Sequence, residues 1–168
     1  MTAKEKQTEF IKTYLKPILK AYGYQVSGQT WWKDKGIFFT VLNLQNYSWN
    51  SKDNVDFRFN IGIALKETVK DPLKMKATYN DLITHLDEGT FLPDRENRKY
   101  GNFQGYSITN ETDLLDLCET IKYDFETYIL PKLDEPKNLQ DLVTFYEPFT
   151  FWADNLKKMI SDYNLIKK

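Results

Sequence analysis

The chain has 168 residues, of which 41% are hydrophobic, 28% charged and 15% aromatic, and its 23 basic and 24 acidic side chains leave a formal net charge of −1. This composition is typical of a folded chain with an aromatic-rich core. The balanced charge excludes the overall positive field that would attract nucleic acid or an anionic membrane surface. The length suits one domain, so we take residues 1–168 as a single α+β domain with residues 149–168 as a C-terminal helical extension.

The sequence also predicts a compartment. No window reaches the roughly 18 apolar residues of a membrane-spanning helix, and residues 1–6 lack the apolar core of a signal peptide. The lone Cys118 can form neither an internal disulfide nor a thiolate zinc site. We therefore expect a cytoplasmic protein.

The first element is predicted to be a helix. Thr2 and Glu5 have the spacing of a capping box, and apolar side chains then recur at helical spacing from Phe10 to Tyr22. Pro17 lies inside this pattern and lacks a backbone donor, so we expect a kink or a break near residues 13–16.

Three strands are predicted to follow. A strand at about Gln29–Lys33 and a second at Ile37–Asn46 flank an acidic, glycine-bearing turn and should form a hairpin. After the loop 47–54, a third strand, Val55–Leu65, alternates apolar and polar side chains. Its apolar positions are Val55, Phe57, Phe59, Ile61, Ile63 and Leu65. Since burying one such side chain contributes about 1.5–3 kcal/mol at most, this strand is the predicted centre of the core.

The next part of the chain has weaker patterns. Residues 66–81 are lysine-rich, contain a proline and predict a loop with one helical turn. Leu82–Leu92 and Phe103–Thr109 are predicted as strands four and five, joined by the charged, turn-rich segment 93–102.

Helices are predicted to complete the chain. Asn110 or Thr112 caps a helix whose apolar stripe runs from Leu114 to Tyr128, and Pro131 is expected to stop it. Two further helices are expected over Leu139–Tyr146 and Phe149–Tyr163. The order of elements predicts an α+β fold, with an antiparallel sheet of about five strands packed by an N-terminal helix and C-terminal helices.

Five segments of this pattern resemble a known family. They are Phe10 to Gly23, Val41 to Gln45, Trp49 to Ser51, Phe57 to Ile63, and Thr112 to Leu133. In these the chain is similar to the bacterial family called domain of unknown function 4304, over about Phe10 to Glu147. The resemblance implies a small cytoplasmic bacterial α+β protein without an assigned activity. At Leu86 to Gly89 the chain departs from the arginine that the family pattern leads us to expect, and the last helix lies beyond that pattern.

The residues that most often carry out catalysis are few. His85 is the only histidine and is interpreted as a structural or surface residue, because triads and metal sites need a partner that no motif supplies. Cys118 lies on the apolar stripe of its helix, where a thiol acts as a small hydrophobe. The glycines form no phosphate-binding loop. We therefore expect no catalytic residue, no metal site and no cofactor.

A basic and aromatic cluster in segment 93–102 is interpreted as a solvated turn. It consists of Arg95, Arg98, Lys99 and Tyr100. Asp94 and Glu96 nearly cancel its charge, which argues against a basic binding site.

The polar side chains of the second and third strands form the main candidate site. Asn43 and Gln45 on one strand and Arg58 and Asn60 on the next could lie side by side on one sheet face. If helices cover only the opposite face, these groups meet water. If a helix or loop covers them, they must be hydrogen-bonded, and a cleft that also includes Trp31 or Trp32 would suit an anionic or peptide ligand. Trp49, in the long loop, either folds back over the sheet or stands out as an anchor for another protein.

Two hypotheses for function follow. In the first, the chain is a non-enzymatic binding or protein-interaction domain, for instance one that neutralises another bacterial protein, and it binds through Asn43, Gln45, Trp49, Arg58 and Asn60. In the second, it is a small-molecule sensor or enzyme with a cleft over the polar sheet face. Another protein is the expected partner, and the sequence does not predict an oligomeric state.

Overall fold

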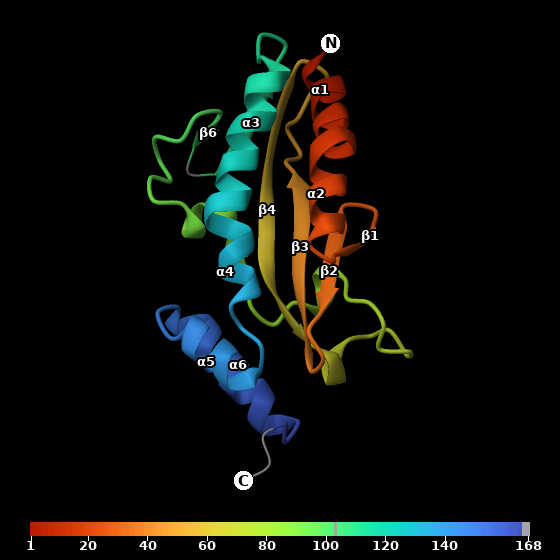
Figure 1. Ribbon diagram of the computed structural model, residues 1–168, viewed down its shortest axis with the longest axis vertical. Helices are drawn as coiled ribbons and strands as arrows, with labels where there is room; N and C mark the ends of the chain where they lie inside the picture. Colours follow the sequence, from red (N-terminus) through yellow and green to blue (C-terminus); the bar gives the residue numbers. More distant parts are fainter. Residues whose placement is uncertain (103, 166–168) are drawn as a thin grey trace.

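The computed structural model describes residues 1–102 and 104–165 and has an α+β fold, as predicted (Figure 1). Its helices are α1 (Ala3–Phe10), α2 (Lys16–Ala21), α3 (Leu114–Asp124), α4 (Leu130–Asp134), α5 (Leu139–Tyr146) and α6 (Thr150–Asp162). Its strands are β1 (Gln25–Ser27), β2 (Thr30–Asp34), β3 (Phe38–Asn46), β4 (Asn54–Leu65), β5 (Leu86–Asp87), β6 (Gly101–Asn102) and β7 (Gly105–Thr109).

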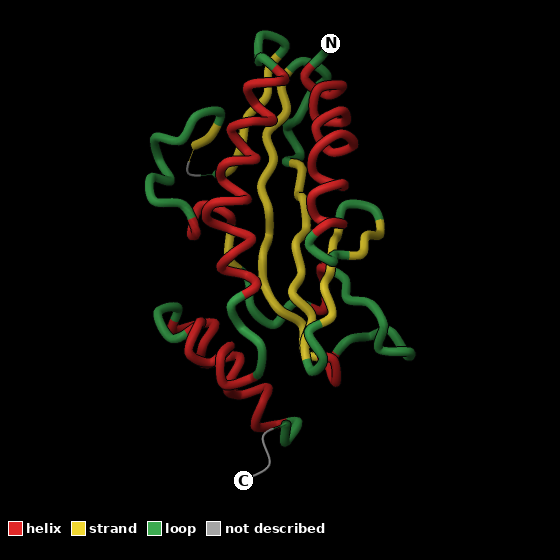
Figure 2. Tube along the Cα trace, viewed as in Figure 1, coloured by secondary structure: helices red, strands yellow, loops and turns green. Residues whose placement is uncertain are grey.

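The strands form one antiparallel sheet in the order β1-β2-β3-β4-β7-β6, and β5 also pairs with β4. The seven strands exceed the predicted five because β1 and β6 are short additions at the two ends of this order. β4 is the longest strand and lies in the middle of the sheet (Figure 2). The predicted strand Phe103–Thr109 begins at Gly105, and Phe103 lies outside the described residues.

Two long helices cover one face of the sheet. The helix containing α1 and α2 and the helix containing α3 and α4 lie side by side over β3 and β4 (Figure 1). The alternation predicted for β4 is confirmed: Val55, Phe57, Phe59 and Ile61 are buried against these helices. From the helices, the core receives Phe10, Leu15, Leu19, Leu117, Ile121 and Phe125.

Each of these helices carries a π-helical turn directly before a proline-containing turn. Residues 11–15 separate α1 from α2, and residues 125–129 separate α3 from α4. The wider turn accommodates Pro17 and Pro131, which lack an N–H and would otherwise collide with the carbonyl four residues earlier. The stop predicted at Pro131 is therefore wrong, and the irregularity predicted near residues 13–16 is a π turn rather than a break.

The cap of α3 also differs from the prediction. Asp113 caps this helix and accepts a hydrogen bond from the Asp116 N–H at 3.0 Å. The two residues proposed as caps have other partners, since Asn110 accepts from the Ala3 N–H and Thr112 accepts from the Thr109 N–H, both at 2.9 Å.

The opposite face of the sheet is covered in part. Segment 66–82 contains two 3₁₀ turns and packs Val69, Ala77 and Leu82 over an apolar patch of the sheet. That patch consists of Trp32, Phe39, Val41 and Ala64. α5 and α6 instead pack at one end of the sheet on the same face as the long helices, where Phe38, Ile63 and Leu65 meet Leu142, Tyr146 and Leu156.

The strand predicted over Leu82–Leu92 is largely wrong. Only Leu86–Asp87 forms a strand, and a 3₁₀ turn over Glu88–Phe91 follows it. Before the strand, the carbonyl of Thr84 lies so close to β4 that a Cβ on Gly62 would be 2.8 Å from the Thr84 carbonyl carbon. A regular strand cannot form here because the backbone crosses over a glycine rather than running alongside it.

Candidate functional site

The structure brings together the four polar side chains predicted to share a sheet face. Asn43 lies opposite Asn60, and Gln45 lies opposite Arg58, in the register of β3 and β4. Asn60 has no exposed surface, and its Nδ2 donates to Asn43 Oδ1 at 3.1 Å and to Gln45 Oε1 at 2.9 Å. The other three are half-buried. Both sequence alternatives therefore apply in part, since the helices cover the opposite face and Asn60 is nonetheless enclosed and hydrogen-bonded.

Arg58 is the only charged member of this group. Its Nη2 donates to Gln45 Oε1 at 3.4 Å, and its guanidinium carbon lies 5.9 Å from the centroid of the Tyr47 ring. No carboxylate among residues 1–102 and 104–165 forms an ion pair with it. Its Nε is buried without a hydrogen-bond partner, as is Oδ1 of Asn60. Buried polar atoms are nearly always hydrogen-bonded, so the Nε–H is suited to donate a hydrogen bond to a ligand and Oδ1 is suited to accept one from it.

His85 extends the group, which the sequence did not predict. Its Nε2 is a third buried atom without a partner, and its ring contacts Tyr79 and Trp152 at centroid distances of 5.9 and 6.1 Å. Burial and the positive charge of Arg58 lower the pKa of His85, and Asp87 opposes them in part. The imidazole is therefore neutral at pH 7. Trp152 belongs to α6, so no local motif near His85 could have indicated the contact.

Trp49 is folded back onto the sheet and also keeps a large exposed surface, while its role as an anchor for another protein stays a prediction. Its ring stacks on Tyr47 at 4.4 Å, and its Nε1 donates to Asp56 Oδ2 at 2.8 Å. The side chain is folded back onto the sheet, yet 57% of its surface remains exposed. Tyr47 thus stands between Trp49 and Arg58.

The two neighbouring tryptophans point to opposite faces of the sheet. Trp31 belongs to the core under the helices. Trp32 lies on the same face as Asn43 and Asn60, but segment 66–82 covers it and its Nε1 donates to the Met75 carbonyl at 3.2 Å. Of the two tryptophans predicted as possible members of the cleft, only Trp32 lies on the face of the site, and it is buried beside the site rather than open to a ligand.

We call this group of residues the Arg58 face. It consists of the polar side chains of Asn43, Gln45, Arg58, Asn60 and His85 and the aromatic rings of Tyr47, Trp49, Tyr79 and Trp152. Residues 15–135 of the chain match the family model described as "Domain of unknown function (DUF4304)". The chain belongs to this family. No curated protein and no solved structure matches the chain. The matched residues include every member of the Arg58 face except Trp152.

A second polar cluster in this DUF4304 domain was not predicted from the sequence. Arg98 is not in a solvated turn: it pairs with Glu88 at 3.0 Å, with 5% and 1% of the two side chains exposed. Its guanidinium carbon lies 4.4 Å from the centroid of Tyr106, whose hydroxyl donates to Asp124 at 2.7 Å. Burial raises the pKa of Glu88 and that of Asp124, although Arg98 opposes the effect on both.

The buried Glu88 satisfies a backbone group of β4 where this strand has no neighbour on one side. β7 pairs with β4 as far as Phe57, and β5 pairs with it from Asn60. In the gap, Glu88 Oε2 accepts the Phe59 N–H at 3.1 Å and replaces a strand neighbour. Since this carboxylate is enclosed and already holds two partners, we regard it as structural.

The other residues of the predicted basic turn are also paired. Arg95 meets Asp87 at 2.6 Å and Lys99 meets Asp116 at 2.5 Å, while the Tyr100 hydroxyl donates to the same Asp116. The turn is therefore held to β5 and α3 by ion pairs, although Asp94, Glu96, Asn97 and Lys99 are exposed, so the predicted solvated turn is wrong only for the buried side chain of Arg98. Asp87 and Glu88 each receive an arginine from this turn.

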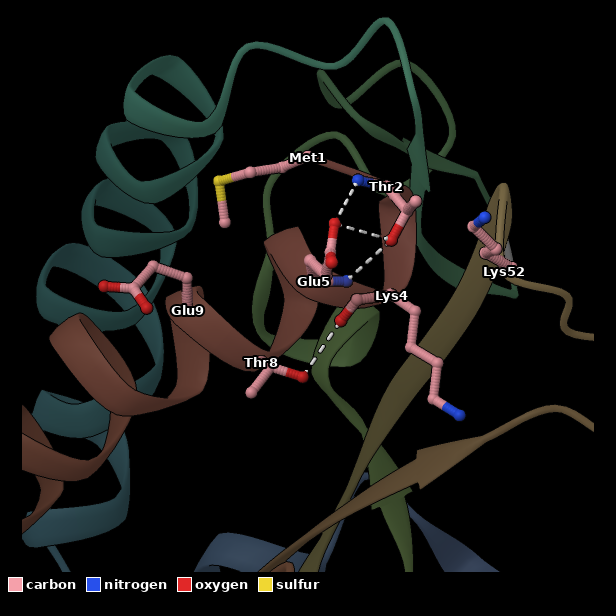
Figure 3. A pocket seen from close by; sticks show the side chains of 7 residues that line it. All are labelled: Met1, Thr2, Lys4, Glu5, Thr8, Glu9 and Lys52. Atoms are coloured by element: carbon pink, nitrogen blue, oxygen red, sulfur yellow. Dashed lines mark hydrogen bonds between the residues drawn. The ribbon is translucent and has the colours of Figure 1, made fainter.

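A hollow of about 750 Å³ lies at the N-terminus of α1 and is lined by Met1, Thr2, Lys4, Glu5, Thr8, Glu9 and Lys52 (Figure 3). The polar groups of Thr2 and Glu5 are used by the helix itself. The Thr2 N–H donates to Glu5 Oε2 at 2.7 Å, and the Glu5 N–H donates to Thr2 Oγ1 at 3.3 Å, which confirms the predicted capping box. The side chains of Lys4, Glu9 and Lys52 also line the hollow and form no hydrogen bond or ion pair within residues 1–102 and 104–165.

The described residues contain neither a metal-binding cluster nor a membrane-spanning helix. In residues 1–102 and 104–165, no three His, Cys, Asp or Glu side chains lie where they could hold a metal ion together. Over the same ranges, no helix has the length and apolar character needed to cross a membrane.

Proposed function

We propose that this DUF4304 domain is a non-enzymatic binding domain whose Arg58 face takes a carboxylate-bearing segment of another protein. One observation carries the proposal: the guanidinium of Arg58 is half-buried, has no carboxylate partner among the described residues, and holds an unpartnered Nε near two other unpartnered polar atoms, Asn60 Oδ1 and His85 Nε2. An arginine fork matches a carboxylate in shape and charge, and such bonds are about twice as strong as neutral ones.

The atoms around Arg58 favour a peptide over a simple anion. Asn60 Oδ1 can only accept a hydrogen bond, so the ligand that satisfies it must carry a donor beside its carboxylate. A peptide with an aspartate or glutamate side chain supplies both, because its backbone N–H is the donor. The partly exposed aromatic rings at both ends of the face also support a protein partner, since Trp, Tyr and Arg dominate the energetics of protein interfaces.

A peptide-display selection on the immobilised domain tests the proposal. We expect enrichment of peptides that contain Asp or Glu, and the best of these should bind Arg58→Gln at least tenfold more weakly than wild type, the loss expected for one charge-assisted hydrogen bond. Arg58→Lys should recover part of the affinity. Lys70→Gln removes an exposed charge elsewhere and should bind like wild type.

Three results would contradict the proposal. The first is enrichment of peptides that lack carboxylates, and the second is binding of the selected peptide to Arg58→Gln as tight as to wild type. The third is that a free dicarboxylate or amino acid raises the melting temperature of the wild type, and not of Arg58→Gln, as much as the selected peptide does. That last result would favour the small-molecule alternative.

A further inference from the structure

A second groove lies on the helical side of the sheet, away from the Arg58 face. It has a volume of about 670 Å³ and is lined by Lys12, Lys16, Pro17, Lys20, Tyr24, Gln25, Val26 and Trp31. One wall is therefore the helix formed by α1, its π turn and α2, and the other wall is the β1–β2 hairpin.

The helical wall carries an uncompensated positive charge. Lys12, Lys16 and Lys20 follow one another at intervals of four residues and all are exposed. None of them forms an ion pair with a carboxylate in residues 1–102 or 104–165. Because the chain as a whole has a net charge of −1, this row is a local feature that complements an acidic ligand.

The opposite wall is apolar and ends in an open strand edge. Val26 lies across from Trp31 in the β1–β2 pairing, and 44% of its surface is exposed while Trp31 is 1% exposed. Nε1 of Trp31 and the hydroxyl of Tyr24 are buried without partners. Within the described residues β1 pairs only with β2, so its other edge offers backbone N–H and C=O groups to an added strand.

We propose that this groove binds an extended acidic segment of a partner protein, with carboxylates at alternate positions. Four residues of α2 rise about 6 Å, and alternate side chains of a strand are about 6.6–6.8 Å apart, so carboxylates on one face of the segment meet Lys16 and Lys20 in register. Lys12 lines the same groove one π turn earlier and is available to a further carboxylate. Its backbone pairs with the edge of β1, and a side chain of the segment contacts Val26.

Two other occupants fit less well. Single-stranded nucleic acid is held by stacking of bases on accessible aromatic rings, whereas Tyr24 and Trp31 are almost fully buried. An anionic membrane attracts clusters of four or more basic residues with exposed large apolar side chains, and this groove offers three lysines and one exposed valine.

Fluorescence anisotropy with an eight-residue probe of alternating glutamate and valine tests the proposal on the full chain. The wild type should bind this peptide and should bind its glutamine counterpart at least tenfold more weakly. The triple variant Lys12→Gln, Lys16→Gln, Lys20→Gln should lose at least tenfold. The charge-matched control Lys70→Gln, Lys122→Gln, Lys157→Gln changes three other exposed lysines and should stay within twofold of wild type. Circular dichroism checks that both triple variants fold.

Further measurements separate this site from the Arg58 face and from other occupants. Arg58→Gln should bind the alternating probe like wild type, and Val26→Asp should bind it more weakly because the new carboxylate repels it. The proposal is overturned if the probe does not bind, or if the two triple variants lose affinity equally. It is also overturned if a twelve-residue oligothymidine or a phosphatidylserine vesicle binds more tightly than the peptide with the same dependence on Lys12, Lys16 and Lys20.

Discussion

Replacing Arg98 by methionine should destabilise the fold through the glutamate that it leaves behind. In the wild type, Glu88 and Arg98 form an ion pair at 3.0 Å with almost no exposed surface. Removing one partner of a buried pair costs about 3–5 kcal/mol, because the remaining charge stays buried without compensation. Methionine keeps an unbranched apolar side chain at this position but loses the guanidinium contact with Tyr106 and the hydrogen bond to the Asn102 carbonyl, so the charge is isolated only by comparison with a variant that also neutralises Glu88. The expected loss is a large part of the total stability of about 5–15 kcal/mol.

The loss should depend on pH in a direction fixed by Glu88. Burial already raises the pKa of this carboxyl, and loss of Arg98 removes a cation that opposes the rise. A folded-state pKa above the unfolded value means that protonation favours the folded state. The Arg98→Met protein should therefore be least stable above the folded-state pKa of Glu88. It should gain up to about 1.4 kcal/mol per pH unit as the pH falls from there toward the unfolded value near 4.3.

Urea unfolding followed by tryptophan fluorescence, at several pH values between 5 and 8, measures both effects. The double variant Glu88→Gln, Arg98→Met is the control, since the glutamine amide has no charge and still accepts the Phe59 N–H. It should be more stable than Arg98→Met at pH 7, and the difference should shrink on acidification. The reasoning is wrong if Arg98→Met costs less than about 1 kcal/mol, or if the double variant is no more stable than the single one.

Three further changes probe the fold. Gly62→Ala should lower the free energy of unfolding by about 3 kcal/mol or more in urea titrations, because the new Cβ meets the Thr84 carbonyl; a loss within the ordinary range of about 1 kcal/mol would contradict the close approach. Thr2→Ala removes the side chain that caps α1 together with Glu5 and should lower the free energy of unfolding by about 0.5–2 kcal/mol. An unchanged melting temperature would show that this cap contributes nothing to stability. Pro17→Ala should change stability by less than about 1 kcal/mol rather than gain the 3 kcal/mol or so expected on relieving a strained helix, since the π turn already accommodates the ring; a large gain by chemical denaturation would refute this.

The elements that could be predicted from the sequence are those whose burial follows one period. β4 is predictable because large apolar residues occupy every second position from Val55 to Leu65 and all are buried, although from Phe59 onward the positions between them are buried as well. The strand predicted over Leu82–Leu92 is largely absent. Backbone groups of this segment are satisfied by contacts distant in sequence, for example the Ile83 N–H that donates to the Ile63 carbonyl at 2.9 Å, and the local pattern of apolar residues does not reveal such contacts. Pro131 misled the prediction for a related reason, since a π turn that admits a proline leaves no mark in the apolar pattern.

The candidate site was only partly predictable. The pairing of Asn43 and Gln45 with Asn60 and Arg58 follows from parity and from the hairpin, both of which are local properties. The contribution of His85 depends on Trp152, which lies 67 residues further along the chain. Arg98 could not be separated from its neighbours in a charged turn, because only the fold determines which arginine faces the buried Glu88.

The polar clusters on the two sides of β4 share one structural cause. Arg58 and Phe59 lie at the interruption between β7 and β5, where β4 has no strand neighbour on that side. Toward the helices, the unpaired Phe59 N–H demands a buried acceptor, and Glu88 with its counterion Arg98 meets that demand. Toward the other face, Gln45 of β3 lies beside Arg58 on one side, but its neighbour on the β7 side is Gly105, which has no side chain. The guanidinium therefore stays half-exposed, and it forms no ion pair with a carboxylate among residues 1–102 and 104–165. A continuous strand across this gap would remove the need for the buried ion pair and would cover the arginine on which the proposed binding depends.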